Sequence, residues 1–140
     1  MSGGNTYQTA YRKNQIQTAT PQQLVLMLYE RAIRDLRQTT EAIEAADLLN
    51  ANKLLLHVED ILNELLISLD LDLPVDEGGQ IALDLGRLYD HYIVRCREAN
   101  ITKDPAIVAE LQQHLSDLRD TWVEAMRKAL QESKGTSREV

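Results

Sequence analysis

The 140-residue chain is long enough to fold as one domain, and its 44% of apolar residues excludes a disordered protein. Aromatic residues are scarce and Phe is absent, so the core must be aliphatic, which favours helices over strands. The net charge of −7 makes nucleic acid and anionic membranes poor partners.

A mobile N-terminal arm is predicted for residues 1–19, because their sequence is polar except for Tyr7, Tyr11 and Ile16. The arm can hold one short helical turn, and it lacks the basic-then-apolar layout of a signal peptide. We expect it to lie outside the core as a cap, where its apolar side chains can cover another surface.

The first two helices have clear start signals. Thr20 is a good N-cap, Pro21 suits the first helical position and Gln23 completes a capping box. The first helix is therefore expected to run to about Ala46. Asp47 is expected to cap the second helix, which spans about 48–70.

The second half of the chain predicts two more helices. A proline and paired glycines make 72–79 a loop, and the third helix follows over about 80–99. Asp104 and Pro105 repeat the cap-then-proline signal and open the fourth helix.

The fourth helix is expected to last to about Glu132, where Lys134 and Gly135 close it and a frayed tail, 133–140, begins. Residues 20–132 are thus predicted to form an all-α, antiparallel four-helix bundle.

The first helix carries more apolar surface than one core stripe requires. Its expected core line comprises Val25, Tyr29, Ala32, Leu36 and Ile43. Leu24 lies on the flank of that line and Met27 on the opposite side. A helix that is apolar nearly all round needs cover. We expect that cover from the arm, from a partner, or from each in turn.

The second helix has an apolar line beyond its core stripe. Its expected core stripe comprises Ala51, Leu54, Leu55, Val58, Ile61, Leu62, Leu65 and Leu69. Leu49, Leu56 and Ile67 cluster on the far side of the helix. Either they are single exposed residues, which are common on protein surfaces, or they form a second contact surface.

The third helix also has two apolar lines. Its expected core line comprises Ile81, Leu85, Leu88, Tyr92, Cys96 and Ala99. Beside that line lie Ala82, Gly86, Tyr89 and Ile93. The small residues of this second line form either the floor of a shallow groove for another helix or a close contact within the bundle.

The fourth helix, by contrast, has a single apolar stripe and no surplus. Its members are Val108, Leu111, Leu115, Leu118, Trp122, Ala125, Met126 and Ala129. It is expected to supply a core face and nothing else.

No catalytic, cofactor or metal site is predicted. A di-iron bundle needs Glu three residues before His, but leucines occupy all three such positions. Cys96 lies on a core line, so it is expected to be a packed small hydrophobe, and as the only cysteine it suits a reducing cytoplasm. The longest apolar run has six residues, Leu24 to Tyr29, whereas a transmembrane helix needs roughly 20.

Several segments of the chain stand out by their sequence, order and spacing. They are Tyr7-Gln8-Thr9-Ala10-Tyr11, Thr18 to Leu24 running into Leu26-Met27-Leu28-Tyr29, Leu88-Tyr89-Asp90-His91-Tyr92, Ala99-Asn100-Ile101 and Leu118-Arg119-Asp120-Thr121-Trp122. Together they resemble the flagellar secretion chaperone (FliS) family. The resemblance covers about residues 5–130. The chain departs from the family pattern at its longer 72–77 loop, at Gly86 and at Cys96.

The resemblance implies a cytoplasmic, non-enzymatic chaperone that binds the disordered C-terminal helical segment of flagellin. It would prevent premature polymerisation and aid delivery to the flagellar type III export gate, with a possible regulatory or co-chaperone partner. The N-terminal cap residues would be Tyr7, Tyr11 and Ile16. The flagellin-binding residues would be Leu24, Met27, Leu49, Leu56, Ile67, Ala82, Gly86, Tyr89 and Ile93.

Two alternatives remain open from the sequence. In the first, the surplus apolar lines bury one another in a homo-oligomeric structural bundle. In the second, the bundle is a metal-binding enzyme. Light scattering separates the first from a chaperone, and elemental analysis tests the second.

Overall fold

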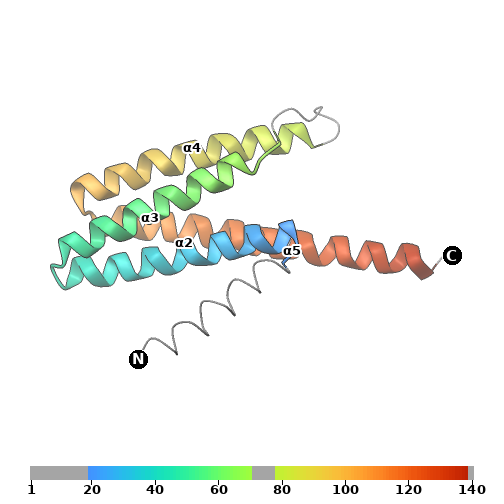
Figure 1. The fold of residues 1–140 in the computed structure, drawn as a ribbon, viewed down its shortest axis with the longest axis horizontal. Helices are drawn as coiled ribbons and strands as arrows, with labels where there is room; N and C mark the ends of the chain where they lie inside the picture. Colours follow the sequence, from blue (N-terminus) through green and yellow to red (C-terminus); the bar gives the residue numbers. More distant parts are fainter. Residues whose placement is uncertain (1–18, 71–77, 139–140) are drawn as a thin grey trace, which may run out of the picture.

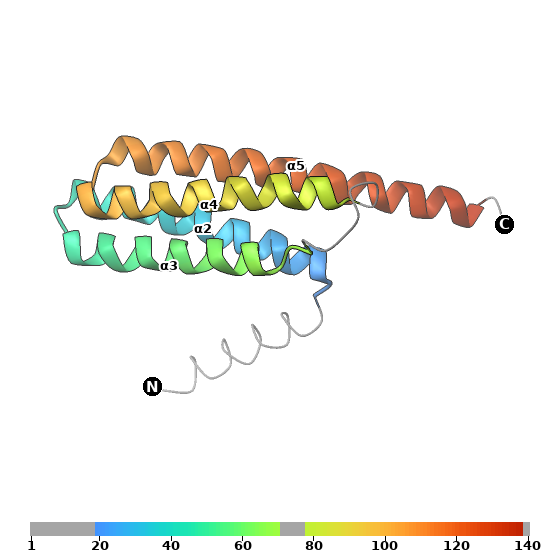
Figure 2. The same ribbon diagram turned by 90° about the horizontal axis from the view of Figure 1, so that it is seen from above.

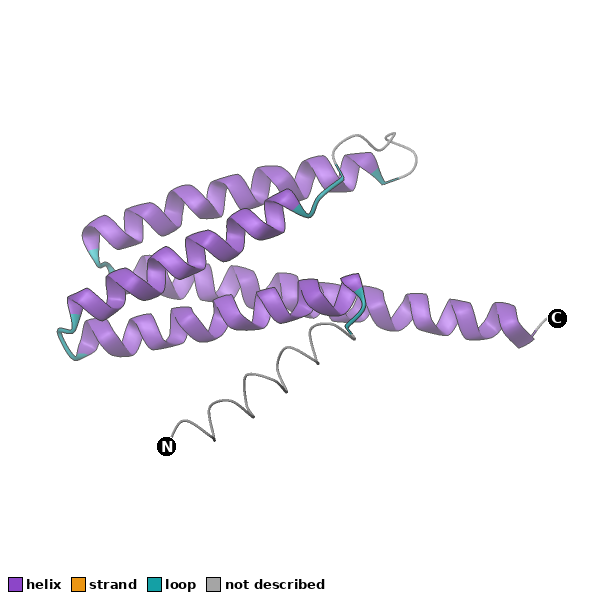
Figure 3. Cartoon of the chain, in the orientation of Figure 1, coloured by secondary structure: helices purple, strands orange, loops and turns teal. Residues whose placement is uncertain are grey.

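The computed structural model describes residues 19–70 and 78–138, with side chains to residue 133, and every regular element in these ranges is an α-helix (Figures 1 and 3). The helices are α2 (Pro21–Glu44), α3 (Leu48–Ile67), α4 (Gly79–Thr102) and α5 (Pro105–Arg138). The all-α four-helix fold predicted from the sequence is confirmed. The proposed cap residues Tyr7, Tyr11 and Ile16 and the 72–77 loop lie outside the described residues.

The predicted helix starts at Thr20, Asp47 and Asp104 are confirmed. The Thr20 hydroxyl accepts from the Gln23 N–H at 3.2 Å, and the Gln23 side chain accepts from the Thr20 N–H at 2.9 Å. Asp47 accepts from the N–H of Asn50 at 3.3 Å, and Asp104 from that of Ala106 at 2.9 Å. Each bond satisfies an N–H that the first helical turn leaves without a partner.

Each helix packs against its neighbours in the chain and runs antiparallel to them (Figures 1 and 2). In addition, α2 packs along α5, whereas α4 packs on α5 less extensively than on α3. In Figure 1 the α3–α4 pair diverges from the α2–α5 pair, and the separation is largest at the end of the bundle where α2 begins.

The last part of α5 projects beyond the bundle and runs farther than expected, through Gly135 to Arg138 (Figure 2). The sequence-based end near Glu132 was therefore too early. One glycine weakens a helix by about 1 kcal/mol but, unlike proline, leaves its hydrogen bonds possible.

The aliphatic core expected from the composition lies between the four helices. Its fully buried large side chains include Leu36, Leu55, Val58, Leu62, Leu65, Val108, Leu111 and Leu115. Across this core the hydroxyls of Tyr29 and Tyr89 form a hydrogen bond between α2 and α4. Burial raises the pKa of both hydroxyls, so both remain neutral donors and acceptors inside the bundle.

Helix α4 is rotated relative to the sequence-based expectation. Ala82, Tyr89 and Ile93, expected beside the core, are buried within it, whereas Ile81 and Leu88, expected in the core, are exposed. The reason is that α4 carries apolar residues on more than one side, so spacing alone does not fix which side faces inward. Tyr92, Cys96 and Ala99 are buried as expected.

Candidate functional site

The seam between α3 and α4 is held by two contacts that fix the register of the helices. The Arg97 guanidinium donates to the Glu59 carboxylate at 2.5 Å, and the Cys96 thiol donates to the Leu55 carbonyl at 3.3 Å. Leu55 and Cys96 are buried, whereas the guanidinium of Arg97 is largely exposed. The Glu59–Arg97 ion pair therefore marks the outer side of the seam.

On α3, the line expected to lie away from the core is exposed. Leu49, Leu56 and Ile67 have exposed fractions of 69%, 47% and 82%. Steps of seven and eleven residues return to nearly the same side of a helix at 100° per residue, so the three side chains share one face. The prediction that these residues lie outside the core is confirmed, and their contact with a partner remains a prediction.

On α4, a second exposed line was missed in the sequence. Leu83, Val94 and Ile101 are separated by eleven and seven residues, and all three are exposed, Val94 at 59% and Ile101 at 84%. The signal that could have found them is that their spacing repeats, in reverse order, the spacing of the α3 line. Because the two helices are antiparallel, the reversed spacing gives both lines the same order of steps along the α3–α4 pair, and the contacts between the helices decide which side each line faces.

Both lines lie on the same outer side of the seam. Leu56 comes three residues before Glu59, and Val94 comes three residues before Arg97, so each line is turned by a similar angle away from the ion pair. With the ion pair as register, the order along the seam is Leu49, then Leu56 beside Ile101, then Val94, Ile67 and Leu83. We call these six residues the seam face.

The other predicted binding residues do not join the seam face. Ala82, Gly86, Tyr89 and Ile93 are buried beneath the surface, so the expectation that they form an open groove beside the core is wrong for this structure. The burial of Gly86 and Ala82 agrees with the close-packing alternative.

Leu24 and Met27 are half-buried near the start of α2, which does not border the α3–α4 seam. The structure therefore does not bring these two residues together with the α3 line. The expectation that the arm or a partner covers this segment stays a prediction.

A polar network lies on the other side of α3, where it meets α2. The buried Asp35 carboxylate bonds Nδ1 of His57, and Arg31 donates to Nε2 of the same ring at 2.8 Å. Because a guanidinium can only donate, Nε2 must accept and Nδ1 carries the proton. This arrangement satisfies the buried Asp35 carboxylate through His57, so it is explained as packing of α2 on α3.

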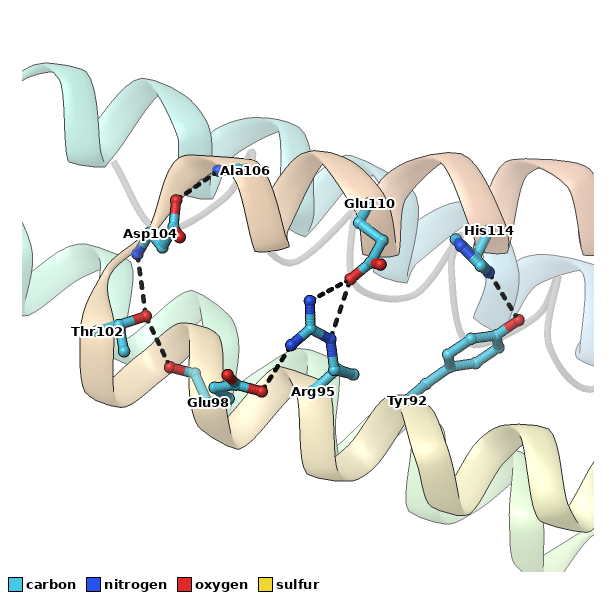
Figure 4. Close-up of polar contacts among 8 residues, drawn as sticks. All are labelled: Tyr92, Arg95, Glu98, Thr102, Asp104, Ala106, Glu110 and His114. Atoms are coloured by element: carbon cyan, nitrogen blue, oxygen red, sulfur yellow. Dashed lines mark hydrogen bonds and ion pairs between the residues drawn. The ribbon is translucent and has the colours of Figure 1, made fainter.

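The contact between α4 and α5 is braced by Arg95, which lies between two carboxylates (Figure 4). Its guanidinium donates to Glu110 at 2.6 Å and to Glu98 at 2.7 Å, and the hydrogen bond from Arg95 lowers the pKa of Glu110. Nearby, the Tyr92 hydroxyl lies 3.2 Å from Nδ1 of His114. These contacts lie along the half of α4 that leads into the α4–α5 turn.

Among residues 19–70 and 78–133 there is no group of three or more His, Cys, Asp or Glu side chains placed to hold a metal. Burial raises the pKa of the Cys96 thiol to about 12, which keeps it protonated and unreactive. Among the helices that the structure describes, no segment combines the length and the hydropathy of a transmembrane span.

Comparison with known proteins places this bundle in a family. The family model of the flagellar protein FliS matches residues 3–129. The chain is 31% identical over 128 residues to the flagellar secretion chaperone FliS of Bacillus subtilis, covering 91% of this chain and 92% of that one. It is 29% identical over 134 residues to FliS of Salmonella typhimurium, covering 95% and 97%.

A solved structure described as a flagellar chaperone from bacteria has the same fold, with a TM-score of 0.70 and 26% identity. The superposition covers 89% of this chain and 98% of that one. Fold, length and sequence agree along nearly the whole chain. The protein therefore belongs to the FliS family of flagellar secretion chaperones.

Proposed function

We propose that the protein binds the disordered C-terminal segment of flagellin as a helix laid along the seam face. The observation that supports this most directly is the double line of exposed aliphatic side chains on two adjacent helices. Exposed apolar patches on soluble domains usually mark interaction sites, and a groove between two helices suits an amphipathic third helix. In the cytoplasm such binding prevents premature polymerisation of flagellin before its delivery to the export gate.

The energetics indicate that the seam face is one part of a larger contact. Covering its six partly exposed side chains contributes roughly 5–11 kcal/mol of hydrophobic free energy. Ordering the disordered segment alone costs about 2–5 kcal/mol, and association costs about 4 kcal/mol or more. Tight capture therefore requires additional surface, and we propose that the segment also wraps toward Leu24 and Met27 on α2.

The N-terminal arm is proposed to compete for this additional surface. Tyr7, Tyr11 and Ile16 supply apolar side chains that can cover the start of α2 until the substrate displaces them. Deleting residues 1–17 should then leave the bundle folded and tighten binding of a flagellin C-terminal peptide, measured by calorimetric titration. Unchanged affinity would reject the cap, and weaker binding would show that the arm assists capture.

The direct test of the proposed function is capture of flagellin by variants of the seam face. Leu56→Asp and Val94→Asp each place a charge in the middle of the surface and should abolish co-purification with intact flagellin while helicity is retained. Wild-type protein should fail to retain flagellin that lacks its C-terminal segment. Equal capture of both flagellins would contradict the proposal.

The same exposed lines also support a homodimer, in which two seam faces bury each other. Light scattering over a range of protein concentrations distinguishes these functions. A monomer at all concentrations favours the chaperone, whereas a dimer that Leu56→Asp dissociates favours a structural assembly.

A further inference from the structure

The charges beside the seam face are unbalanced, because its cations lie next to carboxylates of their own and its central acids form no ion pair. Arg97 pairs with Glu59, and Arg87 lies 4.0 Å from Asp84. Arg95 lies on the α5 side of α4, where it pairs with Glu110. Within the part of the chain that the structure describes, the exposed carboxylates of Asp60 and Asp90 form no ion pair.

These two carboxylates lie inside the apolar lines. Asp60 follows Leu56 by four residues and precedes Ile67 by seven, so it shares their side of α3. Asp90 follows Leu83 by seven residues and precedes Val94 by four, so it lies beside that line on α4, on the flank toward the ion pair, whereas Asp60 lies on the flank away from it. With the Glu59–Arg97 register, both acids belong to the middle of the seam face.

The nearest cation without an ion pair on the described outer side of α3 is Lys53. It precedes Asp60 by seven residues, which is about 10 Å along the helix axis. Lys53 therefore lies toward the Leu49 end of the seam and does not neutralise its centre. The middle of the surface combines aliphatic contact with two free negative charges.

A helix that covers this surface partly removes both carboxylates from water. A helix with apolar or acidic flanks would leave Asp60 and Asp90 desolvated without a partner, or would repel them. A helix with lysine or arginine beside its apolar stripe would instead form charge-assisted hydrogen bonds with them. We infer that the seam face selects an amphipathic helix with cationic flanks, and that Asp60 and Asp90 determine this specificity. The inference rests on the proposed function and deepens it.

Two designed peptides separate charge recognition from apolar contact. Both are amphipathic helices with the same leucine and isoleucine stripe, one flanked by lysine and the other by glutamate. Fluorescence anisotropy should show that the full-length protein binds the lysine peptide about tenfold or more tightly than the glutamate peptide at low salt, with the difference shrinking as salt is added.

The variant Asp60→Asn/Asp90→Asn should weaken binding of the lysine peptide by about three- to tenfold and leave the glutamate peptide bound equally or better. Its matched control is Glu30→Gln/Glu41→Gln, which changes net charge equally at two exposed positions of α2. The control should bind both peptides like the wild type. Far-UV circular dichroism verifies that each variant is folded.

The outcomes distinguish the inference from the function on which it rests. Equal binding of both peptides, binding of neither, or an equal loss in the control variant would overturn the selection of cationic helices. If Leu56→Asp weakens peptide binding but Asp60→Asn/Asp90→Asn does not, the seam face stands and the charge inference fails. If Leu56→Asp leaves binding of peptides and flagellin unchanged, the proposed surface itself is wrong.

Discussion

Ile93 and Val94 are neighbours in α4 with opposite environments, and substituting each by alanine separates folding from binding. Ile93 is 6% exposed and packs in the core, so Ile93→Ala should lower the free energy of unfolding by about 2–5 kcal/mol. Val94 is 59% exposed, so Val94→Ala should change it by less than about 0.5 kcal/mol.

Binding should respond in the opposite order. If a helix covers the exposed part of Val94, Val94→Ala removes about 1 kcal/mol of contact, which is roughly a fivefold rise in Kd. Ile93→Ala should leave Kd nearly unchanged under conditions in which that variant is folded.

Urea unfolding followed by far-UV circular dichroism gives the free energy of unfolding, and calorimetric titration with a flagellin C-terminal peptide gives Kd. Equal destabilisation by the two substitutions would show that α4 is rotated about its axis, so that Val94 is as buried as Ile93. A loss of binding in Ile93→Ala but not in Val94→Ala would show that the binding surface lies on the side of α4 that carries Ile93.

Three further predictions concern the interior. His57→Ala removes the donor to the buried Asp35 carboxylate and should destabilise the fold by roughly 1–3 kcal/mol in urea unfolding; no measurable loss would mean that water satisfies Asp35 equally well. Burial raises the pKa of Tyr29 and Tyr89 above the ordinary value of 10.0, so the unfolded chain releases these protons first. Stability should therefore be fully present below pH 10 and fall above it, and the fall should shrink in Tyr29→Phe/Tyr89→Phe; a flat profile in the parent protein would contradict this. Cys96 is buried with its pKa raised to about 12, so a thiol reagent at neutral pH should react only as the bundle opens, and rapid labelling of the native protein would refute this burial.

Local signals in the sequence were sufficient for the helix starts and for α3. Thr20 and Asp47 each act through a side-chain bond to a backbone N–H three residues away, so no distant part of the chain is needed to recognise them. In α3 one broad core stripe leaves a separate outer line, and the exposure of Leu56 and Ile67 followed from spacing alone.

The orientation of α4 could not be obtained in the same way. Apolar residues such as Ile81, Ala82 and Leu83 follow one another there, so a helix turned by one residue has an equally apolar inner face. The choice is made by tertiary contacts, including the Tyr29–Tyr89 hydrogen bond and the limited packing of α5 on α4.

The apolar stripe of α5 shows a second reason why burial could not be predicted fully from the sequence. The Trp122 indole N–H donates to the Gln22 carbonyl at 3.0 Å, so α2 begins level with this part of α5. Ala125 and Ala129 continue the stripe but are exposed, because α5 outlasts its partner helix. Relative helix lengths and offsets depend on the assembled bundle, which hydrophobic periodicity within one helix does not encode.

Methyl NMR during titration with the flagellin C-terminal segment shows whether a partner helix lies along the outer side of the α3–α4 seam. If it does, the methyl signals of Leu56, Ile67, Val94 and Ile101 should shift together and early in the titration, whereas those of the buried Leu62 and Leu115 should shift little. Shifts confined to α2 and α5, with the four seam signals unchanged at saturation, would contradict it.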